Sequence, residues 1–411
     1  MNPLPMVVAD LRSMRWTGMA VVLIVAVAVA SVVAIDAQER TVRTASSRAA
    51  DDFDLVIGAP GSEAQLVFSS VYLDLAALAL VDGQVLNTLA RDPRVAAVAP
   101  IAFGDRIGGA PVIGTTAAFA SRWGRLGPAE GRLFDRLTEA VVGADVALAV
   151  GSRAVPVHGI AGHGQEDEEE HARHGAAEAY TVVGRLPRLG SAWDRSILVP
   201  VESVWAVHGL GHGHREDAER RPAWLGPPFD GTTVPGVPAI VVKPRAVADA
   251  YALRAQYRGN GTTAVFPAEV LVGLYRVMGD VRDALLVATW ANTALVFSAL
   301  ALVVATLTGL RRRRYAILRA LGAPARYIAA VVWLGSAALV ATGGVIGLPL
   351  GWLGAAVLSI AVEARTGLAL APAPAWSDVA LAFGLVCLGT LASVVPALLA
   401  HRVPVGIALR S

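Results

Sequence analysis

The sequence predicts an α-helical membrane protein with four transmembrane helices and a large α+β extracytoplasmic domain between the first and second helices. The 411-residue chain is 55% hydrophobic, carries charge on 17% of its residues and has a mean hydropathy of +0.55. This composition is more apolar than that of an ordinary soluble domain. Four uncharged runs exceed the ~18 residues that span a bilayer. Acidic residues are concentrated in one region between two of these runs.

The four uncharged runs predict membrane helices at residues 17–35, 284–310, 327–362 and 379–400. A cleaved signal peptide is the alternative for the first run, but that run is longer than the ~7–15-residue core of such peptides. The third run could be one long helix or a hairpin of two short spans. We favour one helix, because a hairpin would place the C-terminal arginines outside, against the positive-inside rule.

The charge distribution predicts the orientation. Residues 36–283 hold 30 of the 33 acidic residues but only 24 of the 35 basic ones, a net charge of −6, whereas the rest of the chain has a net charge of +8. Cytoplasmic flanks collect Arg and Lys. We therefore predict cytoplasmic segments at residues 1–16, 311–326 and 401–411, an extracytoplasmic domain at 36–283 and a short extracytoplasmic loop at 363–378. The expected location is the inner (plasma) membrane, with both termini in the cytoplasm.

The region between the first two runs has the pattern of a folded α+β domain. Residues 54–62 predict a strand that runs into a Gly-Pro turn, and residues 63–80 predict a largely apolar helix. Residues 139–151 predict a short strand followed by a helix of small residues. Mixed strands and helices indicate an α+β class. The length allows one elaborated domain or two subdomains.

Seven of the eight histidines lie between residues 158 and 214, in or beside two polar segments, 159–178 and 209–231, which we interpret as loops. Imidazole and the neighbouring carboxylates are ligands that Zn²⁺ accepts. The alternative is a pair of solvated loops in which histidine is incidental, and the sequence leaves both open. The candidate metal ligands are His163, His171, His174, His208, His212 and His214.

Sequence motifs for catalysis are absent from the chain. No GxxxxGK[ST] phosphate loop occurs, and the single lysine, Lys243, lies between Val242 and Pro244. There is no HExxH and no GxSxG, and the single cysteine, Cys387, permits no disulfide within the chain. We therefore predict a non-catalytic chain that binds no cofactor of its own, apart from the zinc hypothesis, and that has no nucleic-acid partner.

The stretch RRRRYAILRALGAPARYI joins the second and third membrane runs. In a helix, Tyr315, Leu318 and Leu321 follow i, i+3 spacing, and Gly322 and Pro324 would end the helix. This predicts a small apolar face surrounded by arginines, a surface that a partner protein could grip. On charge alone, the favoured interpretation is a positive-inside stop signal beside the lipid headgroups.

The longer stretch RRRRYAILRALGAPARYIAAVVW resembles the signature of the MacB/FtsX-type permeases of ABC transporters. DLVIGAPGSEAQLVFSSVY after the first run, AVVGADVALAVG in the domain and PALLAHRVPVGIALR at the end also resemble that family. The resemblance implies a permease subunit that works as a homodimer or heterodimer with a separate cytoplasmic ATPase. That partner would carry ATP and Mg²⁺.

By the same resemblance, residues 311–326 form the coupling helix that docks on the ATPase. At Tyr315, many family members carry an acidic residue, so an ion pair there is not carried over to this chain. The coupling residues that the resemblance implies are Arg311, Arg312, Arg313, Arg314, Tyr315, Leu318, Arg319, Leu321 and Gly322.

The resemblance implies export or transmission of movement to the outside domain. An FtsX-like regulator that activates a periplasmic protein is the alternative, and a metal-binding or metal-sensing membrane protein is another. The segment YTVVGRLPRLGSAWDRSILVPVESVWAVHG resembles a subgroup with His-rich loops that is often linked to zinc-responsive systems. In the third run, Gly343, Gly347 and Gly351 form a ridge of small residues that predicts close helix packing.

Overall fold

The computed structural model divides the chain into two compact units. The helical unit comprises Met1–Arg43, Met278–Ala361 and Leu370–Ser411, and the domain comprises Thr44–Val277 and Val362–Ala369. The described residues are 2–13, 15–158, 179–214, 225–230, 233–259, 261–276, 287, 290–291, 293–294, 298, 306, 312–394 and 397–398. The expected membrane run at 284–310 lies largely outside the described residues, and the segments at 159–178 and 401–411 lie wholly outside them.

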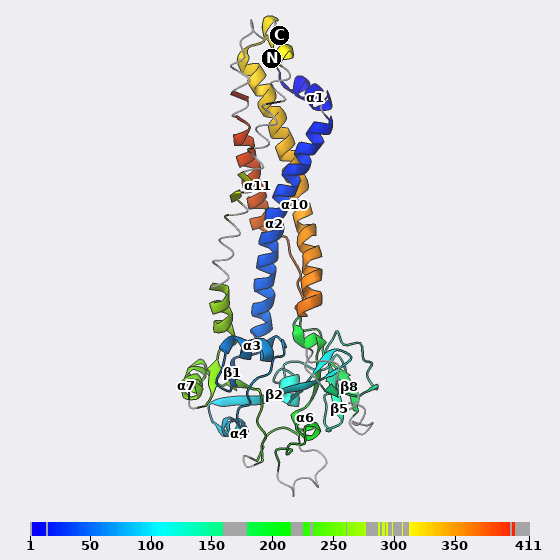
Figure 1. The fold of residues 1–411 in the computed structure, drawn as a ribbon, viewed down its shortest axis with the longest axis vertical. Coiled ribbons are helices and arrows are strands. Elements are labelled where there is room, and N and C mark those ends of the chain that lie inside the picture. The colour runs from blue at the N-terminus through cyan, green and yellow to red at the C-terminus, as the bar shows by residue number, and fades with distance from the viewer. Residues whose placement is uncertain are drawn as a thin grey trace. The chain divides into compact units, whose positions relative to one another are not determined.

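Two helices of the helical unit are long and apolar enough to cross a membrane, α2 and α10, and α11 is a shorter apolar helix. α2 continues well past the expected end of the first run at residue 35, and α10 is one continuous helix that contains Pro349. The helices of this unit with described bounds are α1 (Leu4–Ser13), α2 (Arg15–Ala50), α9 (Arg312–Ala320), α10 (Ala325–Thr366) and α11 (Trp376–Ala392) (Figure 1).

A tight turn separates α9 from α10. Gly322 has a φ of 98°, in the left-handed region that glycine favours. The Ala323 N–H donates to the Leu318 carbonyl at 3.0 Å, a bond that terminates a helix. α10 then begins directly after Pro324, which cannot continue the preceding helix.

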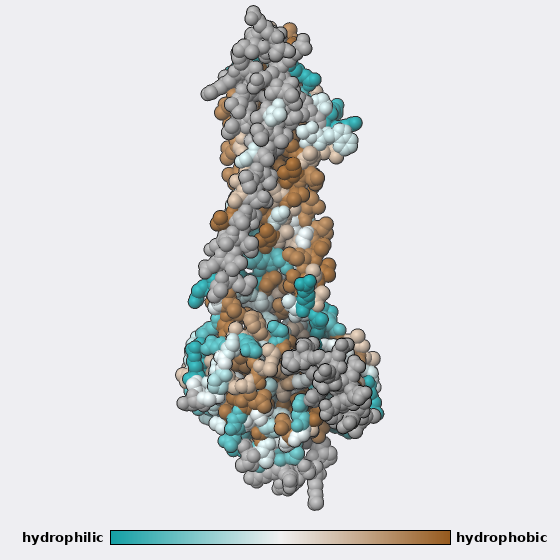
Figure 2. Space-filling view, viewed as in Figure 1, coloured by the Kyte–Doolittle hydropathy of each residue, from teal (hydrophilic) through white to brown (hydrophobic). Residues whose placement is uncertain are grey.

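The helical unit buries one apolar core and leaves much apolar surface uncovered. Its core includes Val25 and Val29 of α2, Val332 of α10 and Leu385 of α11. Large apolar side chains are exposed along the same three helices, as Figure 2 shows by colour. A water-soluble protein rarely exposes so much apolar surface, whereas a bilayer solvates it. Examples are Leu23, Ile24, Val345, Leu353, Val357, Ile360, Phe383 and Leu391.

The domain is α+β, as predicted, and is built on an eleven-stranded sheet. The strand order is β11-β1-β10-β2-β3-β9-β5-β8-β4, with β6 paired to β8 and β7 to β2. Most pairs are antiparallel, whereas β3–β9 and β5–β8 are parallel. The strands are β1 (Leu55–Gly58), β2 (Val95–Ile107), β3 (Ala110–Thr115), β4 (Glu130–Gly131), β5 (Glu139–Val142), β6 (Arg153–Ala154), β7 (Val157–His158), β8 (Tyr180–Arg185), β9 (Ile197–Pro200), β10 (Ala239–Pro244) and β11 (Thr263–Val265).

Helices cover both faces of this sheet, since alternate strand residues enter two different cores. One face is packed by α4 (Gly83–Arg91), α6 (Val201–Val207) and α7 (Val247–Tyr257). The other face is packed by α3 (Glu63–Val71), α5 (Ala117–Ala120), the 3-10 helix η3 (Ala192–Arg195), the end of α2 and helical residues 267–276. Figure 1 shows α3 and α4 on opposite sides of the sheet. The end of α2, which follows the first membrane run, and residues 267–276, which precede the second, therefore pack on the same face of the sheet.

Two helix predictions for the domain were wrong. The stretch at residues 63–80 is helical only as far as Val71, because Leu73 takes a left-handed φ of 54° that breaks the helix. The described residues 143–151, directly after β5, form no helix. The Arg185 guanidinium instead donates to the carbonyls of Gly143, Ala144, Val146 and Leu148, so a side chain satisfies the backbone acceptors that a helix would have paired internally.

Candidate functional site

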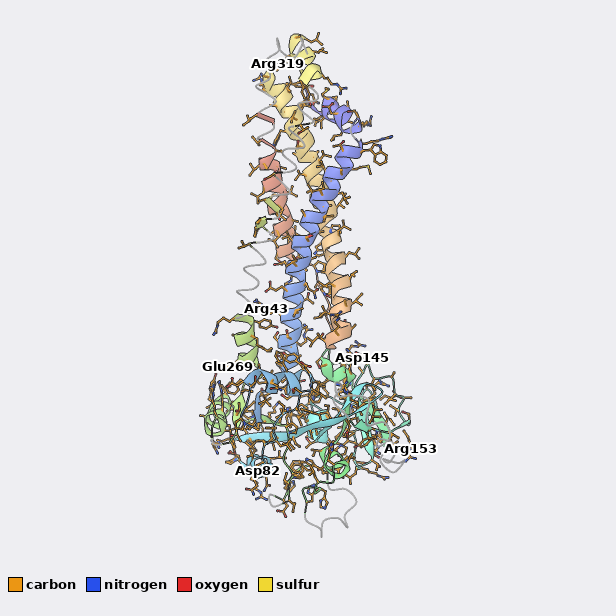
Figure 3. The ribbon with its side chains drawn as sticks, in the orientation of Figure 1. Arg43, Asp82, Asp145, Arg153, Glu269 and Arg319 are labelled. Carbon is orange, nitrogen blue, oxygen red and sulfur yellow. The ribbon has the colours of Figure 1, made fainter. Side chains whose placement is uncertain are left out.

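The segment predicted to couple to an ATPase contains α9, which is anchored to the helical unit along one side. Tyr315 and Ala316 are buried, and Tyr315 belongs to the same core as Ile328 and Val332 of α10. Leu318 packs against that core in part. Figure 3 places Arg319 near one end of the helical unit and Arg43, on α2, toward its other end.

The apolar face expected on this segment is divided by the fold. Tyr315 and Leu318 face the unit's own core, whereas Leu321 is 80% exposed and Ile317 is 46% exposed. The reason is that α9 ends at Ala320, so Leu321 lies in the turn and no longer follows helical spacing. Ile317 and Leu321 are therefore large apolar side chains of this segment that remain available to a partner.

The arginines of the segment are only partly described. Arg314 is exposed, and its Nη1 lies 3.5 Å from Asp10 Oδ1 of α1. Arg319 is half-buried and Gly322 forms the exposed turn. Arg312 and Arg313 belong to α9, and Arg311 lies outside the described residues.

The glycine ridge of α10 lies directly against α2. A Cβ at Gly343 would lie 2.7 Å from Val25 Cβ, and one at Gly351 would lie 2.7 Å from Val33 Cβ. A Cβ at Gly347 would lie 2.7 Å from the carbonyl oxygen of Ala26. These separations are too short for any larger side chain, so the two helix backbones approach closely along three successive turns.

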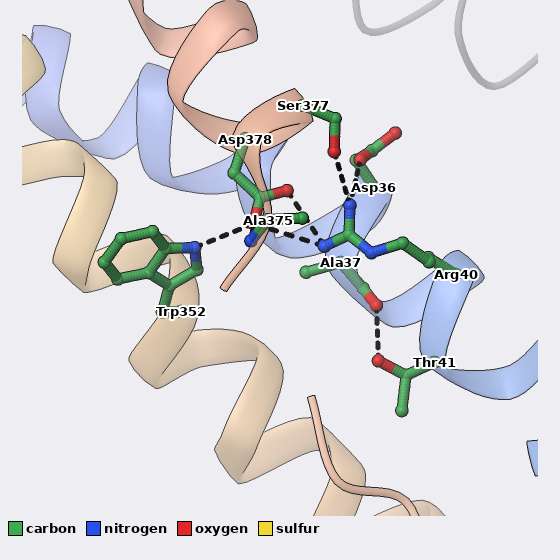
Figure 4. Close-up of polar contacts among 8 residues, drawn as sticks. All are labelled: Asp36, Ala37, Arg40, Thr41, Trp352, Ala375, Ser377 and Asp378. Atoms are coloured by element: carbon green, nitrogen blue, oxygen red, sulfur yellow. Dashed lines mark hydrogen bonds and ion pairs between the residues drawn. The ribbon is translucent and has the colours of Figure 1, made fainter. Parts of the chain in front are cut away.

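A buried carboxylate, which the sequence analysis did not identify, joins α11 to the two long helices. The Asp378 side chain is 0% exposed. Its Oδ1 accepts a hydrogen bond from Arg40 Nη2 of α2 at 3.0 Å, and its Oδ2 accepts one from Trp352 Nε1 of α10 at 2.9 Å (Figure 4). The Ala375 N–H also donates to Oδ2, at 2.9 Å. We call Arg40, Trp352 and Asp378 the polar cluster.

The neighbours of the polar cluster hold Arg40 in place. Its Nη1 donates to Ser377 Oγ at 2.6 Å and lies 3.2 Å from Asp36 Oδ2 (Figure 4). Nearby along the same helices, Ser359 Oγ donates to Gln38 Oε1 at 3.0 Å. Together with the bonds to Asp378, these contacts join α2 to α10 and α11 through polar groups.

In the domain, the end of α2 is held by a buried arginine. Arg122 is 1% exposed, and its Nε lies 3.0 Å from Asp52 Oδ2. Its guanidinium also lies over the rings of Phe119 and Trp193, 4.6 and 4.7 Å from their centroids. Burial lowers the pKa of Arg122 to about 10, although Asp52 opposes that shift, so the group stays charged near neutral pH.

A second contact joins α2 to helical residues 267–276, which precede the second membrane run. Ser46 Oγ is hydrogen-bonded to Tyr275 Oη, and Tyr72 Oη donates to the Ser46 carbonyl at 2.8 Å. Two chain segments that lead to expected membrane helices are therefore tied together inside the domain.

The described histidines of the proposed metal set do not converge. His208 Nδ1 lies 2.7 Å from the Val204 carbonyl, and His212 Nδ1 accepts the His214 N–H at 3.2 Å. His214 Nε2 lies 3.4 Å from Glu202 Oε1. Within the described part of the chain, no group of three or more His, Cys, Asp or Glu side chains could hold a metal ion. The other three candidates, His163, His171 and His174, lie outside the described residues.

Comparisons with known proteins agree with this architecture. The family model of the MacB-like periplasmic core domain matches residues 17–259, and that of the FtsX-like permease C-terminal region matches residues 286–405. The comparison with curated proteins gave no match.

Two solved structures are similar to parts of the chain. The periplasmic region of MacB from Actinobacillus actinomycetemcomitans has 10% identity and a TM-score of 0.33, over 55% of this chain and 94% of that one. The extracellular domain of the noncanonic ABC-type transporter YknZ from Gram-positive bacteria has 10% identity and a TM-score of 0.31, over 51% and 98%. Since one family model alone matches more than half of the chain and a second matches its C-terminal helices, the chain belongs to the MacB/FtsX-type ABC transporter permeases.

Proposed function

We propose that this permease transmits ATP-driven movement from a separate cytoplasmic ATPase to its own extracytoplasmic domain. Family membership makes the chain the membrane subunit of an ABC transporter, with a periplasmic domain. Coupling to the ATPase, the direction of transport and the choice between export and mechanical activation of a periplasmic protein belong to the proposal.

The proposed topology has four spans, at residues 17–35, 284–310, 327–362 and 379–400, with both termini in the cytoplasm. The lengths and apolar composition of α2 and α10 support the first and third spans, and α11 supports the fourth. The segment around α9 is then cytoplasmic, beside Arg314 and Arg319. A second copy of the chain is the proposed partner within the membrane.

The observation that carries the proposal is the division of the coupling segment into an anchored side and an exposed side. Tyr315 holds α9 to the core of the helical unit, while Ile317 and Leu321 leave apolar surface exposed among arginines. Because Tyr315 packs in that core, α9 cannot rotate independently of the core when a partner binds its exposed side. Displacement of α9 must therefore displace the start of α10, which follows it after one turn.

α10 could carry that displacement over a long distance. It has 42 residues without interruption, which corresponds to about 63 Å at a rise of ~1.5 Å per residue. The glycine ridge and the polar cluster bind it to α2 and α11. A push at the α9 end would then move the three helices together rather than bend one of them.

The test replaces Ile317 and Leu321 with Asp in the full-length chain, co-expressed with its ABC ATPase partner. Leu318 is not a suitable target, since it packs against the core and its replacement would destabilise the fold. We expect that the ATPase no longer co-purifies. Formation of the apolar interface would bury two carboxylates without partners, which costs free energy. Val247→Asp is the matched control, because Val247 is 76% exposed in the domain. Unchanged co-purification and ATP turnover in the double variant would refute the coupling site.

Zinc binding by the histidine segments remains a separate proposal, motivated by composition. Deletion of residues 209–231 would also remove Phe229, which is buried against Trp205, so it would confuse folding with binding. Replacement of His163, His171 and His174 by Gln avoids that problem. Zinc binding equal to that of the unaltered chain, measured by calorimetry, would remove these three histidines from the proposal.

A further inference from the structure

The domain contains a cleft of about 640 Å³ that the proposed function does not use. Its walls come from residues 72–73 after α3, the β2–β3 hairpin tip at residues 106–111, the segment at 145–148 after β5, η3, and residues 365–367 at the end of α10. The volume lies within the ~300–1,000 Å³ of typical small-molecule sites. Five segments far apart in the sequence thus form one concave surface.

The polar lining of this cleft is strongly basic. Arg106, Arg195 and Arg365 come from three of the five lining segments. One carboxylate, that of Asp145, also lines the cleft, but it already forms an ion pair with Arg188. Among the described residues, no carboxylate forms an ion pair with any of the three lining arginines.

The hydrogen bonds of these arginines leave donors available. Arg106 Nη1 donates to the Gly109 carbonyl at 3.3 Å, while its buried Nε has no hydrogen-bond partner among the described residues. Arg195 Nη1 donates to the Ala364 carbonyl at 3.2 Å. Carbonyl partners position a guanidinium without cancelling its charge, and a buried donor without a partner costs free energy until an acceptor arrives. Planar guanidinium groups bind phosphate in a bidentate manner.

Apolar side chains line the rest of the cleft. Ile107 and Val146 are buried side chains that line the cleft, and Leu73 and Leu148 add half-buried surface. An inorganic anion would leave these walls without a contact. The lining therefore fits a ligand that combines a phosphate with an apolar part.

The position of Arg365 on α10 favours one source of that ligand. The uncharged run of this helix ends at Val362, and Arg365 follows about 4.5 Å further along the helix axis, at ~1.5 Å per residue. Basic residues at that distance from an apolar span lie at the level of the lipid headgroups. The adjoining loop is fixed within the domain, since the Ala369 N–H donates to the Gly190 carbonyl at 3.2 Å.

We propose that this cleft binds a phosphate-bearing amphiphile, with Arg106, Arg195 and Arg365 around the phosphate and Ile107 and Val146 against its apolar part. A membrane phospholipid headgroup is the source that the chain geometry favours, and a soluble organic phosphate is the other source. The proposal does not depend on the ATPase, so it can fail while the coupling proposal stands.

The test uses the purified full-length chain in a charge-neutral detergent and counts bound molecules by native mass spectrometry. The probes are dioctanoyl phosphatidylglycerol, dioctanoylglycerol, which lacks phosphate, and glycerol 1-phosphate, which lacks acyl chains. We expect Arg106→Gln/Arg365→Gln to bind the first phosphatidylglycerol molecule about tenfold or more weakly, because two charge-assisted contacts are lost. Arg91→Gln/Arg153→Gln removes the same charge from exposed positions outside the cleft and should bind as the unaltered chain does.

Each outcome bears on the proposal. Equal loss in the cleft variant and the control, or equal binding of dioctanoylglycerol, would overturn the phosphate site. If glycerol 1-phosphate binds as tightly as the lipid, and the cleft variant loses this binding, the result would support the site and assign it to a soluble ligand. The single variant Arg365→Gln guards against misfolding, because its exposed side chain has no described ion pair. It should weaken phosphatidylglycerol binding in the same direction, and unchanged binding would count against the site.

Discussion

Replacement of Asp378 by alanine removes the carboxylate that joins α11 to α2 and α10. Three donors lose their acceptor: Arg40 Nη2, Trp352 Nε1 and the Ala375 N–H. Asp36 lies on the other side of the same guanidinium but is partly exposed. Asp36→Ala is therefore a matched control. It removes a carboxylate from Arg40 but leaves Trp352 Nε1 and the Ala375 N–H with their acceptor, Asp378.

The magnitude follows from the burial of the partners. Loss of one member of a fully buried ion pair costs about 3–5 kcal/mol, but the Arg40 side chain is 34% exposed and keeps its contacts with Asp36 and Ser377. Solvent and these contacts reduce the free-energy cost of leaving Arg40 without Asp378. With the two donors left unsatisfied, we expect a loss of about 3 kcal/mol for Asp378→Ala. Asp36→Ala should cost about 0.5 kcal/mol, as for an exposed i, i+4 pair.

The assay uses the single cysteine of the chain. Cys387 lies on α11 and is half-buried, so a thiol-reactive fluorophore reports when this helix separates from its neighbours on heating. We expect the unfolding midpoint of Asp378→Ala to fall by on the order of 5 °C or more, and that of Asp36→Ala to change little. The double variant Arg40→Ala/Asp378→Ala should be less destabilised than the sum of its single changes.

Two results would contradict this role of Asp378. Equal midpoints for Asp378→Ala and Asp36→Ala would show that the buried carboxylate contributes no more than the exposed one. Strict additivity of the Arg40 and Asp378 changes would show that the two side chains do not interact in the membrane-embedded protein.

Three further changes test other parts of the structure. Gly347→Leu should lower the unfolding midpoint reported by Cys387, at a cost of about 2 kcal/mol or more, because its Cβ would lie 2.8 Å from Val29 Cβ. Arg122→Met should destabilise the domain by about 1–2 kcal/mol, because it removes the cation–π contacts with Phe119 and Trp193 and one of the two arginine partners of Asp52; tryptophan fluorescence on heating measures this. Glu139→Gln should destabilise the domain near pH 7 but much less near pH 3. Burial alone would raise the pKa of Glu139, but hydrogen bonds from the Arg132 side chain and the Asp135 N–H outweigh it and hold the pKa at about 2. A depressed carboxylate pKa stabilises the fold above about pH 4.5, and this stabilisation is lost as the pH falls toward 2.

Matched controls exist for each of these changes. Gly335→Leu lies on α10 where no atom would approach the new Cβ within 4 Å, Arg125→Met removes an exposed partner of the same Asp52, and Glu130→Gln removes an exposed carboxylate. An equal midpoint for Gly347→Leu and Gly335→Leu, an equal loss for the two arginine variants, or a pH-independent effect of Glu139→Gln would contradict the corresponding prediction.

Local sequence patterns predicted the features that depend on near neighbours in the chain. The apolar runs predicted α2, α10 and α11, because a hydrophobic run of bilayer length needs no tertiary information. The spacing of Gly343, Gly347 and Gly351 placed them on one side of a helix, and the structure packs that side on α2. The strand pattern around Leu55–Gly58 led to the α+β class. Two predicted helical stretches, after Val71 and after Val142, were wrong. Leu73 has a left-handed φ that ends the first, and the Arg185 guanidinium binds the backbone carbonyls of the second. Composition reveals neither feature.

The residues that join distant segments could not be read from the sequence. Arg40 and Asp378 are separated by 338 positions, and only packing of α2 against α11 brings them together. Tyr315 and Leu321 share a helical spacing, but the end of α9 at Ala320 puts one in the core and the other in solvent. The apolar segments, the charged segments and the points where helices can break were predictable, because they are local properties of the chain. Which of these surfaces meet was not predictable, since burial and ion pairing depend on contacts between segments far apart in the sequence.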